Sequence, residues 1–227
     1  MNSLPRLYAV IDAAFFSTVK EVVRFATELV AGGCTLLQYR NKSGNARVML
    51  EQARELKRRL SHSAAPNPHF SQNRRELGHP VRDVGNPRLI MNDRADLCLA
   101  AEFDGVHVGQ DDLSPESVRA IIGLECWLGV STHSPEQLRE ADLTSADYIA
   151  IGPVFSTSSK ERPDPVVGLE GVRRARALTR KPLVAIGGIR RANAASVIEA
   201  GADSVAVISD LLPEPRKSAQ EFFRLLR

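Results

Sequence analysis

Eight short apolar segments alternate with segments of helical spacing along the chain, and this alternation predicts an α/β fold with parallel strands. The apolar segments are rich in Val, Ile, Leu and Tyr and have the length of buried strands. We expect strands at Leu7–Ile11, Thr35–Tyr39, Leu89–Met91, Gly105–Val108, Trp127–Val130, Tyr148–Ile151, Leu183–Ile186 and Ser204–Ile208. Eight such units in 227 residues fit a closed (β/α)8 TIM barrel, which typically needs about 250 residues and can be built from about 200. An open doubly wound sheet is the alternative.

Apolar residues between the first two strands recur at the spacing of one helix face. They are Val22, Val23, Phe25, Ala26, Leu29 and Val30. Gly32-Gly33 and Gly201 follow predicted helices, where glycine readily takes the left-handed conformation that ends a helix. The pattern therefore marks helix ends as well as helix faces.

The composition argues against several classes of protein. Thirty basic and 27 acidic residues give a formal charge of +3, and no basic run with interleaved aromatic residues suggests nucleic acid. No apolar run approaches the ~20 residues that cross a bilayer, and Met1–Arg6 lacks the pattern of a secretory signal. Cys34, Cys98 and Cys126 show no metal-type spacing and are expected to be reduced packing residues. We expect a soluble, cytoplasmic protein that acts on small molecules.

One segment, His62–Pro87, interrupts the alternation with four prolines and few large apolar residues. It predicts a flexible insertion in a single barrel domain that spans residues 1–227. Because it leads from a helix into a strand, we expect it on the face opposite the strand exits. His62, His69 and His79 lie in it at spacings that match no metal motif, so we expect them to be exposed.

Basic residues close the second strand in the sequence Gln38-Tyr39-Arg40-Asn41-Lys42. Strand alternation puts Gln38, Arg40 and Lys42 on one side. A planar guanidinium and a compact ammonium together suit a phosphate or a pyrophosphate. The alternative is a solvated rim.

Acidic residues follow the next two strands, in Asn92-Asp93-Arg94 and Asp111-Asp112. Carboxylates at neighbouring strand ends, close to bases, favour Mg2+ that bridges to substrate phosphates. Alternatively, Asp93 caps the third helix and pairs with Arg94, while Asp111-Asp112 begins the following helix.

Small and hydroxyl-bearing residues follow the last three strands. Phe155–Lys160 is a candidate anion cradle, with a flexible Ser-rich loop as the alternative. Gly187-Gly188 allows close backbone approach, although any tight turn uses such a pair, and Ile208-Ser209 offers main-chain N–H groups. Barrels favour phosphate after strands seven and eight, so we expect a monophosphate here.

Two histidines lie near these exits. His133 follows Ser131-Thr132 and is either an acid or base or a residue that caps or packs the next helix. His107, inside the fourth strand, is expected to be a satisfied histidine in or near the core.

The ordered motifs QYRNK, NDRAD, DGVHVGQDDL, GVSTHS, IGPVFSTSSK, AIGGI and GADSVAVIS closely resemble those of thiamine phosphate synthases, from the second strand to the eighth. Members of this family join a hydroxymethylpyrimidine pyrophosphate to a thiazole monophosphate in a (β/α)8 barrel. The resemblance implies a dissociative, Mg2+-assisted reaction in which pyrophosphate leaves first. It needs stabilisation of the leaving group more than a strong base.

The resemblance also implies roles for individual residues. The pyrimidine and its pyrophosphate would be held by Gln38, Arg40, Lys42, Asn92, Ser131 and Lys160, of which Arg40, Lys42, Ser131 and Lys160 are the predicted catalytic residues. Asp93 and Asp112 would bind Mg2+. The thiazole phosphate would be held by Thr157, Ser159, Gly188, Ile208 and Ser209. We add the neighbours Tyr39, Asn41 and Ser158 to the predicted substrate-binding set.

The chain departs from the family pattern at three places. Ile11-Asp12 stands where the family often has Thr-Asp, Ser159 stands where it usually has Thr, and His62–Pro87 is longer than the usual connection. The rival functions are a tautomerase-like barrel with the same thiazole phosphate site and a non-catalytic, phosphate-binding regulatory barrel. The sequence leaves the oligomeric state open, with a homo-oligomer among the alternatives.

Overall fold

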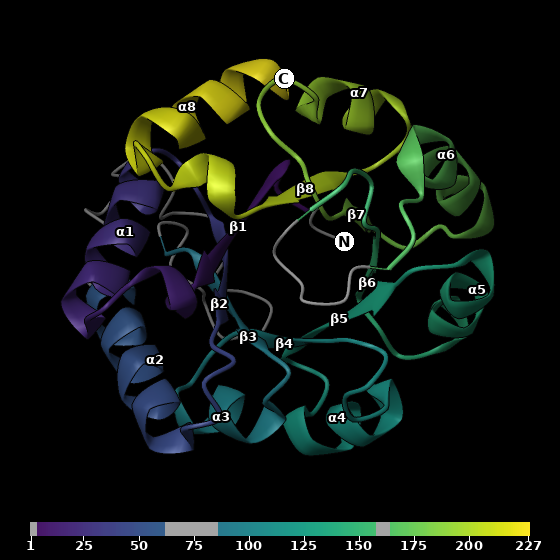
Figure 1. Ribbon diagram of the computed structural model, residues 1–227. Coiled ribbons are helices and arrows are strands. Elements are labelled where there is room, and N and C mark those ends of the chain that lie inside the picture. Colours follow the sequence, from purple (N-terminus) through teal and green to yellow (C-terminus); the bar gives the residue numbers. More distant parts are fainter. Residues whose placement is uncertain (1–3, 62–85, 158–163) are drawn as a thin grey trace, which may run out of the picture.

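A computed structural model describes residues 4–61, 86–157 and 164–227. The strands in these residues pair in parallel and in chain order, and the last pairs with the first, so they close a barrel (Figure 1). The strands are β1 (Leu7–Asp12), β2 (Leu36–Arg40), β3 (Arg88–Asn92), β4 (Gly105–Val108), β5 (Trp127–Thr132), β6 (Tyr148–Ile151), β7 (Leu183–Ala185) and β8 (Ser204–Val207). The predicted (β/α)8 barrel is confirmed, and the open sheet is excluded.

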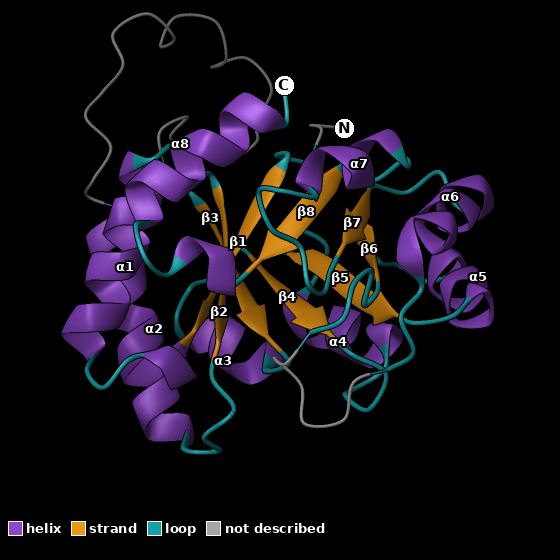
Figure 2. Cartoon of the chain, turned by 45° about the horizontal axis from the view of Figure 1, so that its top comes forward, coloured by secondary structure: helices purple, strands orange, loops and turns teal. Residues whose placement is uncertain are grey.

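Helices surround the strands as an outer ring (Figures 1 and 2). The α-helices are α1 (Val19–Ala31), α2 (Ala46–Ser61), α3 (Ala95–Ala100), α4 (Pro115–Ile122), α5 (Pro135–Leu143), α6 (Gly168–Leu178), α7 (Ala194–Glu199) and α8 (Pro215–Leu225), and the 3-10 helices are η1 (Ala13–Phe15) and η2 (Ser209–Leu211). Helix α1 begins in a capping box between Thr18 and Glu21. Among the described residues, no helix is both long enough and apolar enough to span a bilayer.

Two of the predicted left-handed glycines have that conformation, with φ of 103° at Gly33 and 113° at Gly201. Gly32 does not, because its φ is −80°. Its lack of a side chain serves packing instead, since a Cβ there would lie 2.7 Å from the main-chain oxygen of Arg216 on α8. The cysteines are unpaired, as expected, and Cys34 and Cys98 are buried.

Side chains alternate between two apolar cores along every strand. One core lies between the strands and the helices and contains Leu37, Met91 and Val130. The other fills the barrel and contains Tyr8 and Tyr148. Interior positions near the carboxyl ends of β2, β3 and β5 are polar, namely Gln38, Arg40, Asn92 and Ser131, so the alternation that fills the barrel also places polar groups at the carboxyl ends of the strands.

Three aspartates pin neighbouring strands together where the strands begin. Asp104, Asp147 and Asp203 each precede an even-numbered strand, and the main-chain N–H of each donates to a leucine carbonyl on the preceding strand at 2.8 Å. Each carboxylate accepts the N–H of that same leucine at 2.7–2.8 Å. The leucines are Leu89, Leu128 and Leu183. These reciprocal pairs, which we call the Asp–Leu clamps, fix the register of three strand pairs.

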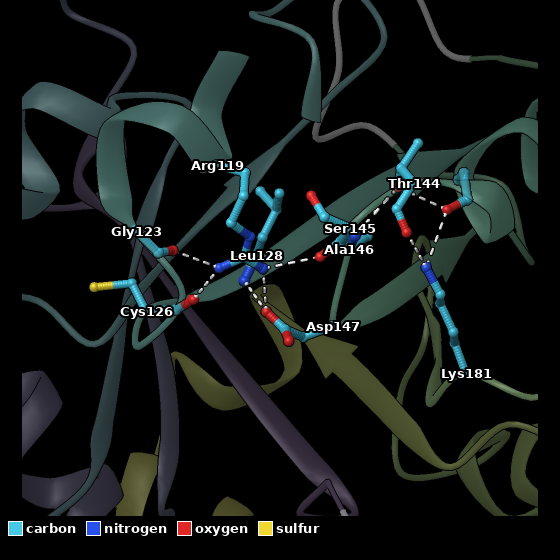
Figure 3. A network of polar contacts seen from close by, with 10 residues as sticks. Arg119, Gly123, Cys126, Leu128, Thr144, Ser145, Ala146, Asp147 and Lys181 are labelled. Carbon is cyan, nitrogen blue, oxygen red and sulfur yellow. Dashed lines mark hydrogen bonds and ion pairs between the residues drawn. The ribbon is translucent and has the colours of Figure 1, made fainter. Parts of the chain in front are cut away.

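The clamp at Asp147 is joined to a wider polar network (Figure 3). Arg119 on α4 donates to the Asp147 carboxylate at 2.7 Å and to the main-chain oxygens of Gly123, Cys126 and Ser145 at 2.7–2.9 Å. Nearby, Lys181 donates to the main-chain oxygen of Thr144 at 2.6 Å. Connections at this end of the barrel are therefore held by charged side chains on main-chain carbonyls.

We predict that Asp147→Ala lowers the free energy of unfolding by about 1–3 kcal/mol, because it leaves the Leu128 N–H without its acceptor. Urea unfolding followed by circular dichroism measures the loss. Glu125→Ala is the matched control, since it removes an exposed acid two residues before β5. Equal stability of the two variants would contradict the clamp.

Candidate active site

A cavity of about 240 Å³ opens at the carboxyl ends of the strands. Its walls come from interior positions of the strands and from the loops after β5, β6, β7 and β8. It is lined by Tyr8, Val10, Gln38, Arg40, Asn92, His107, Ser131, His133, Pro153, Ser156, Thr157, Asp164, Val184, Ile186, Gly187, Gly188, Ile189, Arg190, Ala206, Ile208 and Ser209. The structure thus brings together predicted site residues from strand exits that are far apart in the sequence.

Arg40 is held on the cavity wall by Asp12. The two residues are register partners at the ends of β2 and β1, and their side chains form an ion pair. The buried Asp12 carboxylate also accepts the main-chain N–H of Ala14 at 3.1 Å. The guanidinium therefore has a fixed direction, which favours planar recognition of an anion. The sequence analysis assigned no role to Asp12, although strand parity could have revealed it.

Lys42 and the two predicted metal ligands form a charged group beside Arg40. Lys42 pairs with Asp93, whose φ of 62° is in the left-handed region, where residues other than Gly or Asn are uncommon. The Asp93 N–H donates to the main-chain oxygen of His107, and the Asp112 carboxylate accepts the N–H of Gly109, both at 2.8 Å. Both aspartates are therefore positioned by main-chain contacts with the fourth strand and the loop after it.

The capping alternatives for these aspartates are wrong. Helix α3 has Arg94 at its N-cap without a side-chain cap bond, and Arg94 pairs with Asp96. Helix α4 begins at Pro115, after the N-cap Ser114. Neither Asp93 nor Asp112 caps the helix that follows it, so the capping role does not explain either carboxylate.

Asp112 lies close enough to Asp93 to influence its protonation. Burial raises the pKa of Asp93, the neighbouring Asp112 raises it further, and Lys42 opposes the shift. A divalent cation would relieve this repulsion between like charges, so the pair fits Mg2+. In the described residues no group of three or more His, Cys, Asp or Glu could hold a metal. An ion here would take further ligands from substrate phosphates and water.

The opposite wall is built around the two glycines after β7. Gly187 and Gly188 have φ of 89° and 66°, and a Cβ on Gly188 would lie 2.6 Å from the main-chain oxygen of Ser156. The loop after β6 therefore packs directly on this turn, and Thr157 joins the same wall. Ile208 and Ser209 complete it from β8. The structure agrees with the predicted cluster after strands seven and eight, and the glycines place the neighbouring loop as well as leaving space for a ligand.

His107 is buried and satisfied, as the sequence predicts. Its Nδ1 lies 3.1 Å from Tyr148 Oη, and its Nε2 lies 2.8 Å from Ser131 Oγ. Burial lowers the pKa of His107 to about 4, against a small opposing effect of Asp112. The imidazole is therefore neutral at neutral pH, and it reaches the cavity through Ser131.

His133 is fixed by its neighbours at the edge of the cavity. Its main-chain N–H donates to the Gln137 side chain at 2.7 Å, and its Nδ1 donates to the Gly152 carbonyl at 2.5 Å. Nε2 lies 3.5 Å from an Asp164 carboxylate oxygen. The side chain of Ser134 caps α5. His133 therefore faces the cavity and does not provide the cap.

Some predicted site residues lie elsewhere. Tyr39 and Asn41 have the opposite strand parity to Gln38 and Arg40, and both contact Gln52 on α2 instead of the cavity. This placement does not support the substrate contacts predicted for them. Ser158, Ser159 and Lys160 lie outside the described residues, as does most of the predicted insertion, residues 62–85.

Comparison with known proteins assigns the family. The family model for thiamine monophosphate synthase matches residues 69–211. A curated thiamine-phosphate synthase of Koribacter versatilis is 55% identical over an alignment of 226 residues that covers 98% of this chain and 96% of the relative. The chain belongs to the thiamine monophosphate synthase family. A second member, from Chloroflexus aurantiacus, is 40% identical and covers 90% of this chain and 83% of its own length.

The fold of this family member agrees with a solved structure of the same description. Thiamine phosphate pyrophosphorylase from Pyrococcus furiosus superposes with a TM-score of 0.78 at 29% identity, over 97% of this chain and 95% of that one. The motif resemblance seen in the sequence is therefore confirmed at the level of family and barrel.

The depressed pKa of His107 predicts a specific pH dependence of stability. Between its ordinary pKa of 6.5 and its folded pKa of about 4, the unfolded chain binds a proton that the folded chain does not. The free energy of unfolding should therefore fall as the pH drops through this window, by up to about 3 kcal/mol. Urea unfolding at a series of pH values tests this against His107→Asn, which lacks the titrating ring. If the free energy of unfolding depended on pH in the same way in both proteins, the lowered pKa of His107 would be contradicted.

Proposed function

We propose that the cavity joins 4-amino-2-methyl-5-hydroxymethylpyrimidine pyrophosphate to 4-methyl-5-(2-phosphooxyethyl)thiazole, giving thiamine monophosphate and pyrophosphate. The observation that supports this proposal is that one cavity has two walls of unlike chemistry, each suited to an anion. Arg40, with Lys42 beside it, forms one wall near two carboxylates, and Gly188 and Ser209 belong to the other. A reaction with one pyrophosphate and one monophosphate needs both. As a family member, the enzyme is a transferase.

Arg40 and Lys42 are suited to hold the leaving pyrophosphate. Negative charge grows on that group as the carbon–oxygen bond breaks, and fixed cations stabilise it without reorganising. Asp12 supplies this fixed direction for Arg40. Asp93 and Asp112 would hold Mg2+, which supplies charge neutralisation to phosphate oxygens when bound. The chain then needs no strong base, in agreement with the lowered pKa of His107, which makes its imidazole a weak base.

Ser131, Gln38 and Asn92 line the cavity and are assigned to the pyrimidine half, with Lys160 and Ser159 kept as predicted ligands of pyrophosphate and thiazole phosphate. An isomerisation of a thiazole phosphate would leave the Lys42, Asp93 and Asp112 group without a use, which disfavours the tautomerase-like alternative. A regulatory barrel would bind both substrates and release no product. A cytoplasmic location stays a prediction, and the oligomeric state stays open.

Asp112→Asn should lower kcat of the coupling reaction about 100-fold or more, because charge compensation at the leaving group is lost when it is needed most. Release of pyrophosphate from the two purified substrates, at increasing Mg2+ concentrations, measures this. Asp111→Asn changes the exposed neighbouring acid and is the matched control. Full activity of Asp112→Asn, or full activity of the unmodified enzyme in chelator, would contradict the metal assignment.

Ser209→Ala should raise KM for the thiazole phosphate several-fold, because the substrate loses one hydrogen bond worth about 1 kcal/mol. The KM for the pyrimidine pyrophosphate should stay unchanged. Kinetics with each substrate varied at saturation of the other provide an internal control. A larger effect on the pyrimidine substrate would mean that the two anions occupy the reverse walls.

A further inference from the structure

A chain of buried hydrogen bonds crosses the inside of the barrel and ends at Ser131. Gln38 Nε2 donates to Tyr8 Oη at 3.0 Å, and Tyr8 Oη lies 2.9 Å from Tyr148 Oη. Tyr148 Oη lies 3.1 Å from His107 Nδ1, and His107 Nε2 lies 2.8 Å from Ser131 Oγ. The five side chains come from interior positions of five different strands. We call them the barrel relay.

The direction of each hydrogen bond in the barrel relay follows from the Gln38 amide, whose NH2 group faces Tyr8 Oη. Gln38 already donates to Tyr8, so the Tyr8 O–H donates onward to Tyr148. The Tyr148 O–H then donates to Nδ1 of His107, which must carry no proton. A neutral imidazole with a bare Nδ1 has its proton on Nε2, and that proton is donated to Ser131 Oγ.

The reverse direction leaves a buried donor without a partner. If Nδ1 of His107 carried a proton, Tyr148 would accept it and would donate to Tyr8. Tyr8 would then accept from both Gln38 and Tyr148, and its own O–H would have no acceptor among the described residues. Tyr8 is 1% exposed although it borders the cavity, so its O–H has almost no contact with solvent and an absent acceptor is unfavourable. A doubly protonated His107 meets the same obstacle.

We propose that Tyr8, Tyr148 and His107 are positioning residues that keep Ser131 Oγ an acceptor on its buried side, so that the Ser131 hydroxyl proton points into the cavity as a donor to the pyrimidine substrate. The identity of that substrate rests on the proposed function. In the described part of the chain, His107 is the one hydrogen-bond partner of the Ser131 hydroxyl. Its proton is therefore free for a ligand.

The direction of the hydrogen bond from His107 to Ser131 distinguishes this pair from an activated serine nucleophile and its base. A serine 2.8 Å from a histidine nitrogen has the geometry of a nucleophile with its base. With the proton already on Nε2, however, the imidazole cannot take the proton of Ser131. The pair orients a donor before the substrate arrives, which lowers the entropic cost of forming that hydrogen bond.

Nuclear magnetic resonance of enzyme labelled with 15N in histidine tests the proton order directly. We expect His107 to show a protonated Nε2 and a bare Nδ1 in the free enzyme. In Tyr148→Phe, which removes the donor to Nδ1, we expect a mixture of the two tautomers. Tyr8→Phe keeps the bond from Tyr148 to His107 and should keep the proton on Nε2. A proton on Nδ1 in the unmodified enzyme would overturn the proposal, whether or not the variants fold.

A double-mutant cycle tests whether Tyr148 acts through Ser131. Tyr148→Phe should lower kcat/KM for the pyrimidine substrate about tenfold and leave KM for the thiazole phosphate unchanged. In a Ser131→Ala background the same change should cost less than about twofold, because the donor it orients is gone. Additive effects would overturn the positioning role.

Thr132→Val is the matched control for this cycle. It removes a buried hydroxyl on the same strand that donates to the Ala150 carbonyl at 2.8 Å and faces away from the cavity. Its kinetics should equal those of the unmodified enzyme, and a tenfold loss in it would show that any buried hydroxyl matters. If the unmodified enzyme failed to couple the substrates, the proposed function would be wrong. The tautomer of His107 would still show whether the hydrogen bonds of the barrel relay run in the proposed direction.

Discussion

The register in which eight parallel strands close the barrel decides which side chains reach the cavity. Arg40 faces Asp12 because those two residues pair across β2 and β1, and Asn92 stands beside His107 for the same reason across β3 and β4. A slip of one residue would turn Gln38 and Arg40 toward the helices and Tyr39 into the barrel. The Asp–Leu clamps at the opposite end hold the register of β3 with β4, β5 with β6 and β7 with β8, so residues that never touch substrate still help to determine the site.

Charge in the site is organised by pairing. Asp12 neutralises and aims Arg40 on the cavity wall, and Lys42 does the same for Asp93 beside it. The exception is the approach of Asp93 to Asp112, where burial and like charge raise the pKa of Asp93. An arrangement that is unfavourable without a cation and favourable with one is suited to bind Mg2+ together with a pyrophosphate.

The sequence predicts the strands and their exits well because apolar length and flanking polar residues are local features. Asp93, Asp112, Gly188 and Ser209 were predicted as site residues in this way. Tyr8, Tyr148 and Asp12 were not assigned roles, because their importance depends on partners in other strands. Tyr39 was grouped with Gln38 by adjacency, although the alternation of the strand separates them. The sequence of a single strand does not reveal which residues of the neighbouring strands lie beside it.

The assignment of the two anions to opposite walls is tested most directly by a crystal structure of the enzyme with thiamine monophosphate, pyrophosphate and Mg2+. The account predicts that pyrophosphate contacts Arg40 and Lys42 with the metal on Asp93 and Asp112, and that the monophosphate contacts the main chain at Gly188 and Ser209 on the opposite wall. Both anions bound on one wall, or a metal bound away from the two aspartates, would contradict it.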